Sequence, residues 1–492
     1  MSLPASEPAT GRFAALRRRR PSIAELRASD TAKAAGLAGA MIANNVIALG
    51  SVVIFSRLLD DYGSLAALVS YVIILTVAGQ AMQVATAREG VLGHLGVGRD
   101  LIATLARWTR SLLLFTLVMT VVSVLLRHQI ASLVGVPKDE WAAAAGLPAG
   151  CVYLEVSILR GALQGVGDYK SVGISLVGEQ AARLVLGTAL VLVGLSVTGA
   201  FLGSLLSYVV MSLYCVWRLR GNVLASPQVG RTPEAQSAVL ASAAPPPDPS
   251  AAVIAAPTPA GSPLPSAAPT QLPAPAASTA LGLWTHVKRA WAPIAGLIVI
   301  AVLQNIDIIA AKHRFDQKVD NSYAVAAVAA KVLIWVAMGA GFYLVPEVSR
   351  RRAAGEDTRV VLARALAIIV VCAIPCLLIF GLEPKLLLKL AFGAKRTSAS
   401  ASLLPLGAAF TVLAATYLAI QYMLALKRTW FLIAVAAVAV AEPIFLLQAS
   451  SKPAGFAAVV LGVQAVGALL AFGLALRRDS APPAPAVSPE PA

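Results

Sequence analysis

Long apolar blocks separated by short polar connections make up most of this 492-residue chain. Each block is close to the roughly 20 residues that an α-helix needs to cross about 30 Å of hydrocarbon. The blocks that begin at Ser111, Leu403 and Phe456 contain no charged residue for at least 16 positions. The pattern predicts twelve membrane-spanning helices, at approximately 34–56, 64–86, 109–127, 141–160, 172–194, 197–217, 291–311, 323–345, 365–382, 402–424, 430–449 and 456–476.

The overall composition also indicates membrane insertion. Hydrophobic residues make up 58% of the chain and charged residues 13%, whereas an ordinary soluble domain contains about 25% charged residues. The mean hydropathy is +0.77. The predicted fold class is therefore all-α, a polytopic membrane protein with about twelve transmembrane helices in two six-helix bundles.

A segment of different composition separates the sixth predicted span from the seventh. Between Ala244 and Ala277 it consists almost entirely of Ala, Pro, Ser and Thr, which bury too little apolar surface to offset the entropy of ordering. We therefore expect a disordered linker. The predicted organisation is a basic N-terminal tail (1–33), a first six-helix bundle (34–217), an Ala/Pro-rich linker (218–284), a second six-helix bundle (285–478) and a Pro-rich tail (479–492).

The net charge of +16 is explained by membrane topology. If the N-terminus is cytoplasmic, most Lys and Arg residues fall in cytoplasmic tails and connections, among them Arg17–Arg20, Arg350–Arg352 and Arg477–Arg478. This distribution follows the positive-inside rule. It predicts a multi-pass protein of the cell membrane with both termini and the linker in the cytoplasm, and it requires no nucleic-acid partner.

The two halves of the chain resemble each other at a shift near 260 residues. The segment Leu59–Ala67 aligns with Val319–Ala327, and Leu133–Gly135 aligns with Ala391–Gly393. Because each half has an even number of spans, the halves would share one orientation and be related by an axis along the membrane normal. Repeated halves of this kind are typical of transporters in which two bundles rock against each other.

Neither a metal centre nor an enzyme active site is indicated. The four Cys and four His residues do not cluster, whereas a metal site needs several such ligands together. No Gly-rich loop followed by Lys and Ser or Thr is present, so the sequence contains no ATP-driven motor. We expect no enzyme activity, no cofactor and no catalytic residue.

Six charged side chains lie inside predicted spans. A charge at the membrane centre costs about 2.5–3.5 kcal/mol on insertion scales, so each of them indicates a partner or a function. They are Glu155, Glu179, Arg183, Asp307, Lys331 and Glu442. Glu155 and its neighbour Arg160 lie near the end of their span, and both are expected to reach the aqueous interface by snorkelling.

The first half offers two interpretations for its polar residues. Glu179 and Arg183 are one helical turn apart, which favours an ion pair on one helix face. Alternatively, both line a water-filled cavity. Asn44 and Gln80 add uncharged polarity to the first two spans, and we interpret them as cavity residues, although intramembrane amides also hydrogen-bond neighbouring helices.

The second half contains an expected pair and a further acid. Asp307 and Lys331 lie at similar depth on consecutive antiparallel spans, so they are expected to pair. Alternatively, Lys331 contacts an anionic cargo. Glu442 lies in the span that corresponds by repeat to the span of Glu179, and it is expected to face the same central cavity. Pro443 directly after it is a competing explanation, because proline loosens helical backbone.

Several short stretches resemble the polysaccharide-biosynthesis flippases of the multidrug/oligosaccharidyl-lipid/polysaccharide (MOP) exporter superfamily. Arg57–Leu59 with Tyr62–Gly63 resembles the first outer loop of that family, and Arg160–Gly167 resembles its turn between spans 4 and 5. The second half contributes Asn305–Asp307, Tyr323–Ala324, Val345–Glu347 and Leu390–Gly393. The likeness covers most of the chain apart from the tails and the linker.

The resemblance implies a V-shaped pair of bundles around a hydrophilic cavity. It also implies a polyprenyl-pyrophosphate-linked saccharide as cargo, whose head group crosses through the cavity while its lipid tail stays in the bilayer. Basic residues of the family contact the pyrophosphate, and Lys331 and Arg183 are the positions that match this role. Asn44 and Gln80 are further candidates for substrate contacts.

The chain departs from that family in having four intramembrane acids against two bases. Glu179, Asp307 and Glu442 are therefore candidates for coupling transport to protons or another cation. A cation-coupled multidrug or small-molecule exporter of the same fold is one alternative function. A membrane scaffold whose Pro-rich linker and tail bind cytoplasmic partners is another. A membrane-embedded glycosyltransferase is disfavoured, because the outer connections near 127–140 and 312–321 are short.

Overall fold

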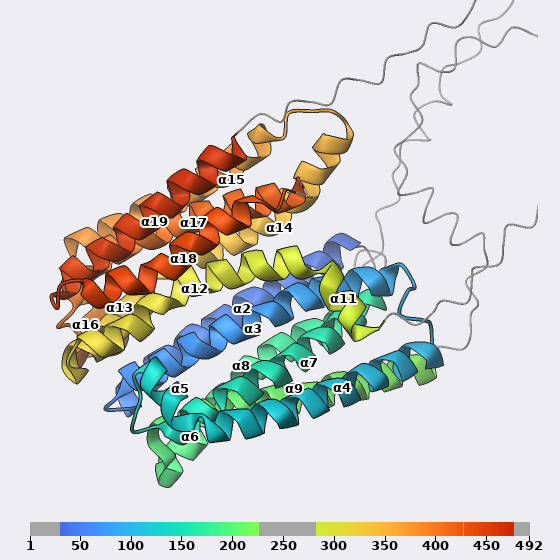
Figure 1. Ribbon diagram of the computed structural model, residues 1–492, viewed down its shortest axis with the longest axis horizontal. Coiled ribbons are helices and arrows are strands. Elements are labelled where there is room, and N and C mark those ends of the chain that lie inside the picture. Colours follow the sequence, from blue (N-terminus) through green and yellow to red (C-terminus); the bar gives the residue numbers. More distant parts are fainter. Residues whose placement is uncertain (1–29, 226–281, 427, 477–492) are drawn as a thin grey trace, which may run out of the picture.

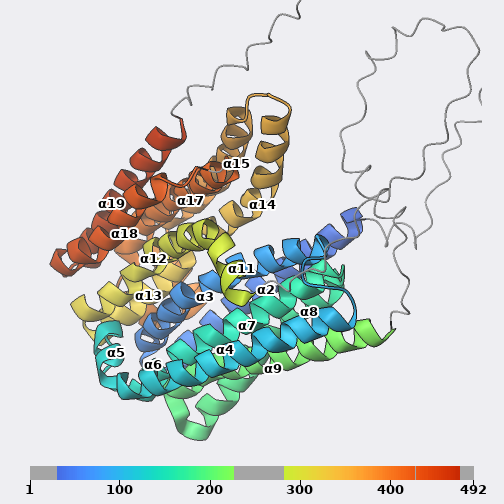
Figure 2. The ribbon, with the colours of Figure 1, turned by 45° about the vertical axis from the view of Figure 1, so that its right-hand side comes forward.

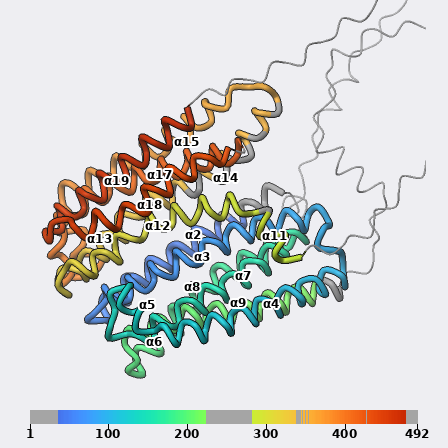
Figure 3. The backbone as a smooth tube through the Cα atoms, viewed as in Figure 1, coloured from blue at the N-terminus to red at the C-terminus, as the bar shows by residue number. Residues whose placement is uncertain are grey.

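The computed structural model describes residues 30–225, 282–426 and 428–476, and every regular element within these ranges is a helix. The first half forms six long helices, which Figures 1 and 3 show in blue to green. They are α2 (Asp30–Leu58), α3 (Tyr62–Val91), α4 (Arg99–Leu125), α7 (Gly146–Gly165), α8 (Tyr169–Leu190) and α9 (Ser196–Ala225). Two short helices, α5 (Arg127–Val134) and α6 (Glu140–Ala144), connect α4 to α7.

The second half repeats this plan in yellow to red (Figure 1). A short helix, α11 (Leu283–Arg289), precedes the first crossing, and α16 (Pro384–Phe392) connects the third crossing to the fourth. The crossings are α12 (Trp291–Arg314), α13 (Gln317–Ala330) continued by α14 (Val332–Ala353), α15 (Arg359–Leu382), α17 (Leu403–Ala425), α18 (Phe431–Gln448) and α19 (Pro453–Ala475).

The number of crossings agrees with the apolar pattern. Ten helical segments are long and apolar enough to cross a membrane. One of them, Tyr169–Asn222, contains two crossings, α8 and α9, joined by a short π-helical segment at Val191–Leu195. The pair α13 and α14 supplies the remaining crossing. The predicted fold class, about twelve helices in two six-helix bundles, is confirmed.

A sharp reversal joins α8 to α9. Gly194 has φ +101° and Ser196 has φ +45°, which places both in the left-handed region that favours glycine. After the reversal α9 packs closely along α8. The helices are so near that a Cβ atom on Gly203 would lie only 2.5 Å from the Cα atom of Gly187. The chain thus folds a 54-residue apolar segment into a helical hairpin.

The molecule has two distinguishable ends. At the linker end the chain leaves α9 and returns at α11, and Figure 1 shows that α2 also begins there. At the opposite end, the far end, α2 meets α3, and the short helices α5, α6 and α16 lie there (Figure 1). Most of the predicted linker and both predicted tails lie outside the described residues, so their disorder and their binding of cytoplasmic partners stay predictions.

The two bundles pack together along α3 and α12 (Figure 2). A large apolar core extends through the second bundle and into the first, and a smaller core fills the linker end of the first bundle. The helix α11 packs on this smaller core: His286 stacks on Trp108 with ring centroids 5.2 Å apart, and its Nε2 lies 3.1 Å from Thr86 Oγ1. This helix therefore belongs to the second half by sequence but attaches to the first half by packing.

The segments that match each other in sequence meet at the far end. Asn321 Nδ2 donates a hydrogen bond of 2.8 Å to the carbonyl of Asp60, and the amide of Gly63 donates one of 2.6 Å to Asn321 Oδ1. These residues lie in the aligned segments Leu59–Ala67 and Val319–Ala327. Corresponding parts of two repeats come together where the axis that relates them passes, so this contact supports the repeat.

Candidate functional site

The interior of the second bundle contains a cluster of three charged side chains. Asp307 of α12 and Glu442 of α18 have no exposed surface, and Lys331 exposes 6% of its surface. Lys331 Nζ lies 3.6 Å from Asp307 Oδ1 and 3.3 Å from Asn305 Oδ1. The expected pairing of Asp307 with Lys331 is therefore present in the structure.

Lys331 occupies a break in its membrane span. It follows the last residue of α13 and precedes the first residue of α14, and the backbone there changes to an i→i+3 bond from the amide of Ile334 to the carbonyl of Lys331. Its ammonium also lies 5.4 Å from the ring centroid of Phe410, within range of a cation–π contact. The Lys331 side chain therefore lies where one helical segment ends and the next begins.

Glu442 is the acid in excess. Gln464 Nε2 donates hydrogen bonds of 3.0 Å to Glu442 Oε1 and to the carbonyl of Leu303. Glu442 Oε2 is buried without a hydrogen bond, and the residue lies within electrostatic range of Asp307 and Lys331. The cluster thus places two carboxyl groups beside one ammonium group. A net negative charge in so enclosed a site is costly unless a proton or another cation neutralises it.

The first bundle contains a different ion pair. Arg160 Nη2 of α7 lies 2.8 Å from Glu179 Oε2 of α8, and Arg160 also donates hydrogen bonds of 2.8 Å to the hydroxyl and the carbonyl of Ser175. Of the two interpretations for Glu179 and Arg183, the ion pair between them is not formed among the described residues, since Glu179 pairs with Arg160 across two helices.

The prediction that Arg160 and Glu155 snorkel to the interface is also wrong. Arg160 has no exposed surface and Glu155 exposes 9%. The physical reason is the close approach of α7 to α3, where a Cβ atom on Gly161 would lie 2.4 Å from the carbonyl oxygen of Gln83. Gly161 therefore packs directly against α3, and the side chain of the preceding residue, Arg160, lies inside the bundle.

The other predicted substrate contacts lie along the first bundle and are less buried. Arg183 on α8 is partly buried, and both it and Glu179 lie within electrostatic range of Tyr208. Asn44 on α2 is partly buried and donates a 3.4 Å hydrogen bond to Asn45 Oδ1, whereas Gln80 on α3 is exposed. The structure therefore divides the predicted set, with Lys331 enclosed in the second bundle and the remaining three residues in the first.

A group of ionic contacts at the far end is not predicted from the sequence. Lys312 Nζ at the end of α12 lies 2.9 Å from Asp61 Oδ1 and 3.1 Å from Asp320 Oδ2, so it joins the connection after α2 to the start of α13. Partial burial by itself would raise the pKa of Asp61. The hydrogen bond and charge of Lys312, together with hydrogen bonds from Ser64, lower that pKa below its usual value.

Two arginines extend this contact. Arg396 donates to the carbonyls of Ser56 and Leu59, and Arg57 donates to the carbonyls of Leu390 and Ala391. Each bond crosses from one half of the chain to the other. We call the five charged residues the far-end latch: Arg57, Asp61, Lys312, Asp320 and Arg396. Among the described residues, no group of three or more His, Cys, Asp or Glu is placed to hold a metal ion.

Comparison with known proteins identifies the architecture. No family model and no curated protein sequence matches the chain. A multidrug resistance MATE family transporter of the MOP superfamily, solved in an inward-facing conformation, matches with a TM-score of 0.57 and 13% identity over 88% of this chain and 94% of the other. The chain has the MATE fold. A eukaryotic MATE transporter matches with a TM-score of 0.56 and 16% identity over 91% and 96%.

A lipid flippase shares the same MATE fold. The lipid II flippase MurJ, in an inward closed conformation, matches with a TM-score of 0.60 and 12% identity over 89% of this chain and 87% of the other. Together with the ten apolar helices, the MATE fold makes the chain a multi-pass membrane protein. At these identities the likeness is one of fold, and the solved proteins with this fold include both a multidrug transporter and a lipid flippase.

Proposed function

We propose that the chain is a transmembrane transporter that flips a polyprenyl-linked saccharide across the cell membrane by alternating access, with the linker end in the cytoplasm. The observation that supports this most is where the flippase-like motifs lie. Arg57 and Gly63 of the first outer loop bond to Ala391 and Asn321 of the second half at the far end. The motifs thus belong to the contact that alternating access must open and close.

The arrangement of the bundles supports alternating access. The far-end latch holds the halves together, whereas at the linker end α14 and α15 lie away from the first bundle in two views (Figures 1 and 2). With the linker in the cytoplasm, this conformation is closed toward the outside. Opening toward the outside then requires the latch to break and the linker ends to approach.

One set of residues would bind the substrate, and a second set would couple transport to a cation. Arg183, Asn44 and Gln80 are the partly buried or exposed members of the predicted substrate set, and Arg183 supplies positive charge for a pyrophosphate. Asp307 and Glu442 would take up a proton or another cation, because they outnumber the ammonium of Lys331. Neutralising Asp307 would free Lys331 and so change the angle at the break between α13 and α14.

The test is the fate of lipid-linked saccharides after the protein is depleted. Polyprenyl-linked intermediates would be extracted, quantified and assigned to a leaflet with an impermeant probe. We expect them to accumulate on the cytoplasmic side, with loss of a surface polysaccharide, and we expect Arg183→Gln to have the same effect. Unchanged intermediates would contradict the proposal.

A second candidate function is cation-coupled export of small molecules. The observation that favours it is the enclosure of Lys331, which leaves one of the two expected pyrophosphate contacts bonded to Asp307 and Asn305. This candidate predicts efflux of cationic dyes that depends on Glu179, Asp307 or Glu442. Dye efflux without any change in lipid intermediates would favour it over flipping.

A further inference from the structure

One carboxyl group of the far-end latch is buried by contact between the two halves of the chain. Asp320, in the first turn of α13, exposes 1% of its surface. A Cβ atom on Gly63 of α3 would lie 1.8 Å from Asp320 Oδ2, so the backbone of the first half covers this carboxylate of the second half. Separating the halves at the far end would uncover it. The burial of Asp320 therefore depends on whether the latch is closed.

Two carboxylates share one cation at this contact. Lys312 Nζ lies 2.9 Å from Asp61 Oδ1 and 3.1 Å from Asp320 Oδ2. Asp320 Oδ1 is buried and accepts no hydrogen bond from the described residues. Since Asp61 and Asp320 come from different halves, their like charges repel each other across the contact. A proton on Asp320 removes that repulsion and leaves Lys312 paired with Asp61 alone.

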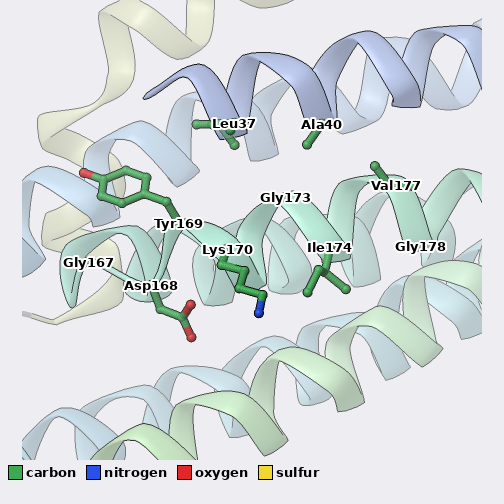
Figure 4. A pocket seen from close by; sticks show the side chains of 11 residues that line it. Leu37, Ala40, Gly167, Asp168, Tyr169, Lys170, Gly173, Ile174, Val177 and Gly178 are labelled. Carbon is green, nitrogen blue, oxygen red and sulfur yellow. The ribbon is translucent and has the colours of Figure 1, made fainter. Parts of the chain in front are cut away.

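A hollow at the far end brings outside water to the latch. Its volume is about 860 Å³, and it is lined by Asp60 of the first half and by residues of the second half that include Asn321 and Arg396. Arg396 is itself a latch residue, and the Asp61 side chain is 29% exposed. A second hollow, between α2 and α8 (Figure 4), is lined by residues of the first half alone and includes no latch residue. Of these two hollows, the one at the far end is the one that opening of the latch would divide.

Other titratable groups lie in the segments around Asp320. His313 Nε2 donates to the carbonyl of Leu133 at 2.9 Å, a bond that a neutral imidazole can also make. The charged and titratable groups are Lys312 and His313 of α12, Asp60 and Asp61 of the α2–α3 connection, Tyr62 of α3, Lys138 and Asp139 between α5 and α6, Lys395 and Arg396 before α17, and Asp316, Lys318 and Tyr323 in or next to α13.

We propose that Asp320 binds a proton from the outside and that this proton favours the closed far-end latch; the proposal rests on the flippase function proposed above for which end faces outside. A carboxyl group that is buried in one conformation and exposed in another binds its proton more tightly in the buried one. By linkage, the proton then favours the conformation that binds it more tightly. An acidic outer solution should therefore hold the far end closed.

The direction and the pH range follow from two carboxyl groups outside the predicted spans. The pKa of Asp320, which precedes the span at 323–345, is raised to about 6: burial is the largest cause, Lys312 opposes it, and Asp61 adds to it. An exposed Asp has a pKa of about 3.9, so the closed form gains on the open form as the pH falls through about 6. Asp61 acts in the opposite sense, because its pKa is lowered in the closed latch. Its contribution to closure is lost only below about pH 4.

The proton would act at one step of the transport cycle. When the far end is open, Asp320 is exposed to the outer solution. Protonation there favours the return to the conformation that is closed toward the outside. This site differs from the cluster of Asp307 and Glu442, which lies inside the second bundle and has no exposed surface at either acid.

Asp320→Asn is the variant that tests the site, and Asp316→Asn is its matched control. Both substitutions keep the shape of the acid, and Asn at position 316 can still cap α13. Spin labels at Leu133 and Leu390, exposed on different halves, would report far-end distances in the full-length protein without its native cysteines. We expect the ratio of open to closed molecules to fall about tenfold from pH 7.5 to pH 5 in the parent protein and in the control. Asp320→Asn should be mainly closed at both pH values, and a pH dependence that persists in it would overturn the proposal.

Lys312→Gln gives a second, independent readout. It removes the cation that opposes protonation of Asp320, so the midpoint of the pH dependence should move to a higher pH. The open form should also be more populated at pH 7.5, which makes the transition easier to measure. A midpoint that is unchanged or lower would contradict the assignment, even if Asp320→Asn failed to fold.

Two further variants address the neighbouring titratable groups. Burial and Asp61 also raise the pKa of Asp139, and His313 joins the two halves through Leu133. Asp139→Asn and His313→Gln should both keep the pH dependence, and its loss in either would move the proton to that group and overturn the proposal. A pH-dependent far end in a protein that flips nothing would reject the proposed function but keep the proton site. Flipping with a pH-independent far end would reject the site alone.

Discussion

The two buried ionic clusters, one in each bundle, differ in charge balance and in backbone setting. Arg160 and Glu179 pair one base with one acid between unbroken helices. Asp307, Lys331 and Glu442 place two acids beside one base at a break between α13 and α14. A balanced pair between continuous helices is expected to stabilise their packing, whereas the unbalanced cluster at the break is the site where we propose that a cation binds. Halves with the same fold have thus acquired different chemistry.

Removal of Arg160 is expected to give the largest effect. Arg160→Met leaves Glu179 buried without its partner, which should lower the free energy of unfolding by about 3–5 kcal/mol. Thermal unfolding of the purified protein in detergent would show this as a lower Tm. The double variant Arg160→Met with Glu179→Met should recover most of the loss, because an apolar pair of similar volume replaces a buried ion pair at little cost.

The stability of the double variant can also contradict this comparison of the two ionic clusters. If it unfolds as easily as Arg160→Met alone, the packing volume of Arg160 and its bonds to Ser175 hold α7 against α8, and the ion pair does not. The first cluster would then be a packing feature rather than an electrostatic one.

Neutralising Glu442 is expected to reduce transport without lowering the stability of the protein. Glu442→Gln removes the excess charge and keeps an oxygen that can accept the hydrogen bond from Gln464. Transport driven by an imposed proton or sodium gradient should fall about tenfold, within the range of a coupling free energy of about 1–3 kcal/mol, while the Tm is unchanged or higher. Glu383→Gln, an exposed acid at the far end, is the control. Retained gradient dependence together with a large loss of Tm would assign Glu442 to structure.

The far-end latch should show an intermediate effect on conformation. Lys312→Gln leaves Asp61 and Asp320 facing each other without their shared partner. The Lys312–Asp61 pair is partly exposed and contributes about 0.2–1 kcal/mol, whereas Asp320 is buried and is left without its partner. The population open at the far end should therefore rise by at least about twofold. Distances between spin labels at Leu133 and Leu390, both exposed, would measure it in a chain without its native cysteines. Lys318→Gln changes an outer lysine outside the latch, and an equal shift there would contradict the assignment.

The sequence predicts the spans and the repeat because these depend on composition and on local pattern. The apolar blocks of about 20 residues match the crossings, and the pairing of Asp307 with Lys331 follows from their equal depth on adjacent spans. The break at Lys331 is not predictable in this way, since no Gly or Pro lies between Ala324 and Ala337. The helix is interrupted there by tertiary packing and not by a residue of low helix propensity.

The pairing of Arg160 with Glu179 is not predictable from the sequence for a related reason. The apolar pattern gives the depth of a side chain only through its distance to the end of a block, which assumes a straight helix at the membrane boundary. Close packing at Gly161 moves that part of α7 into the protein, and the partner of Arg160 is on the next helix. Contacts that depend on the relative position of two helices are not contained in the pattern of either one. The far-end latch belongs to the same class, because all of its contacts except Lys312 with Asp320 join residues separated by some 250–340 positions.

Tyr323→Phe is expected to have the smallest effect, and it separates the two acids of the second cluster. The Tyr323 hydroxyl donates to Asp307 Oδ2 at 3.3 Å, and its ring packs against Phe315 and Phe456, so the substitution removes one long hydrogen bond and keeps the ring. Hydrogen bonds between membrane helices average about 0.6 kcal/mol, so gradient-driven transport should change by less than about threefold. If Tyr323→Phe abolished coupling as fully as Glu442→Gln, the cation would act at Asp307 under control of this hydroxyl. Glu442 would then be a fixed charge that takes no part in coupling. Each cluster would contain one functional acid–base pair, Arg160 with Glu179 and Lys331 with Asp307.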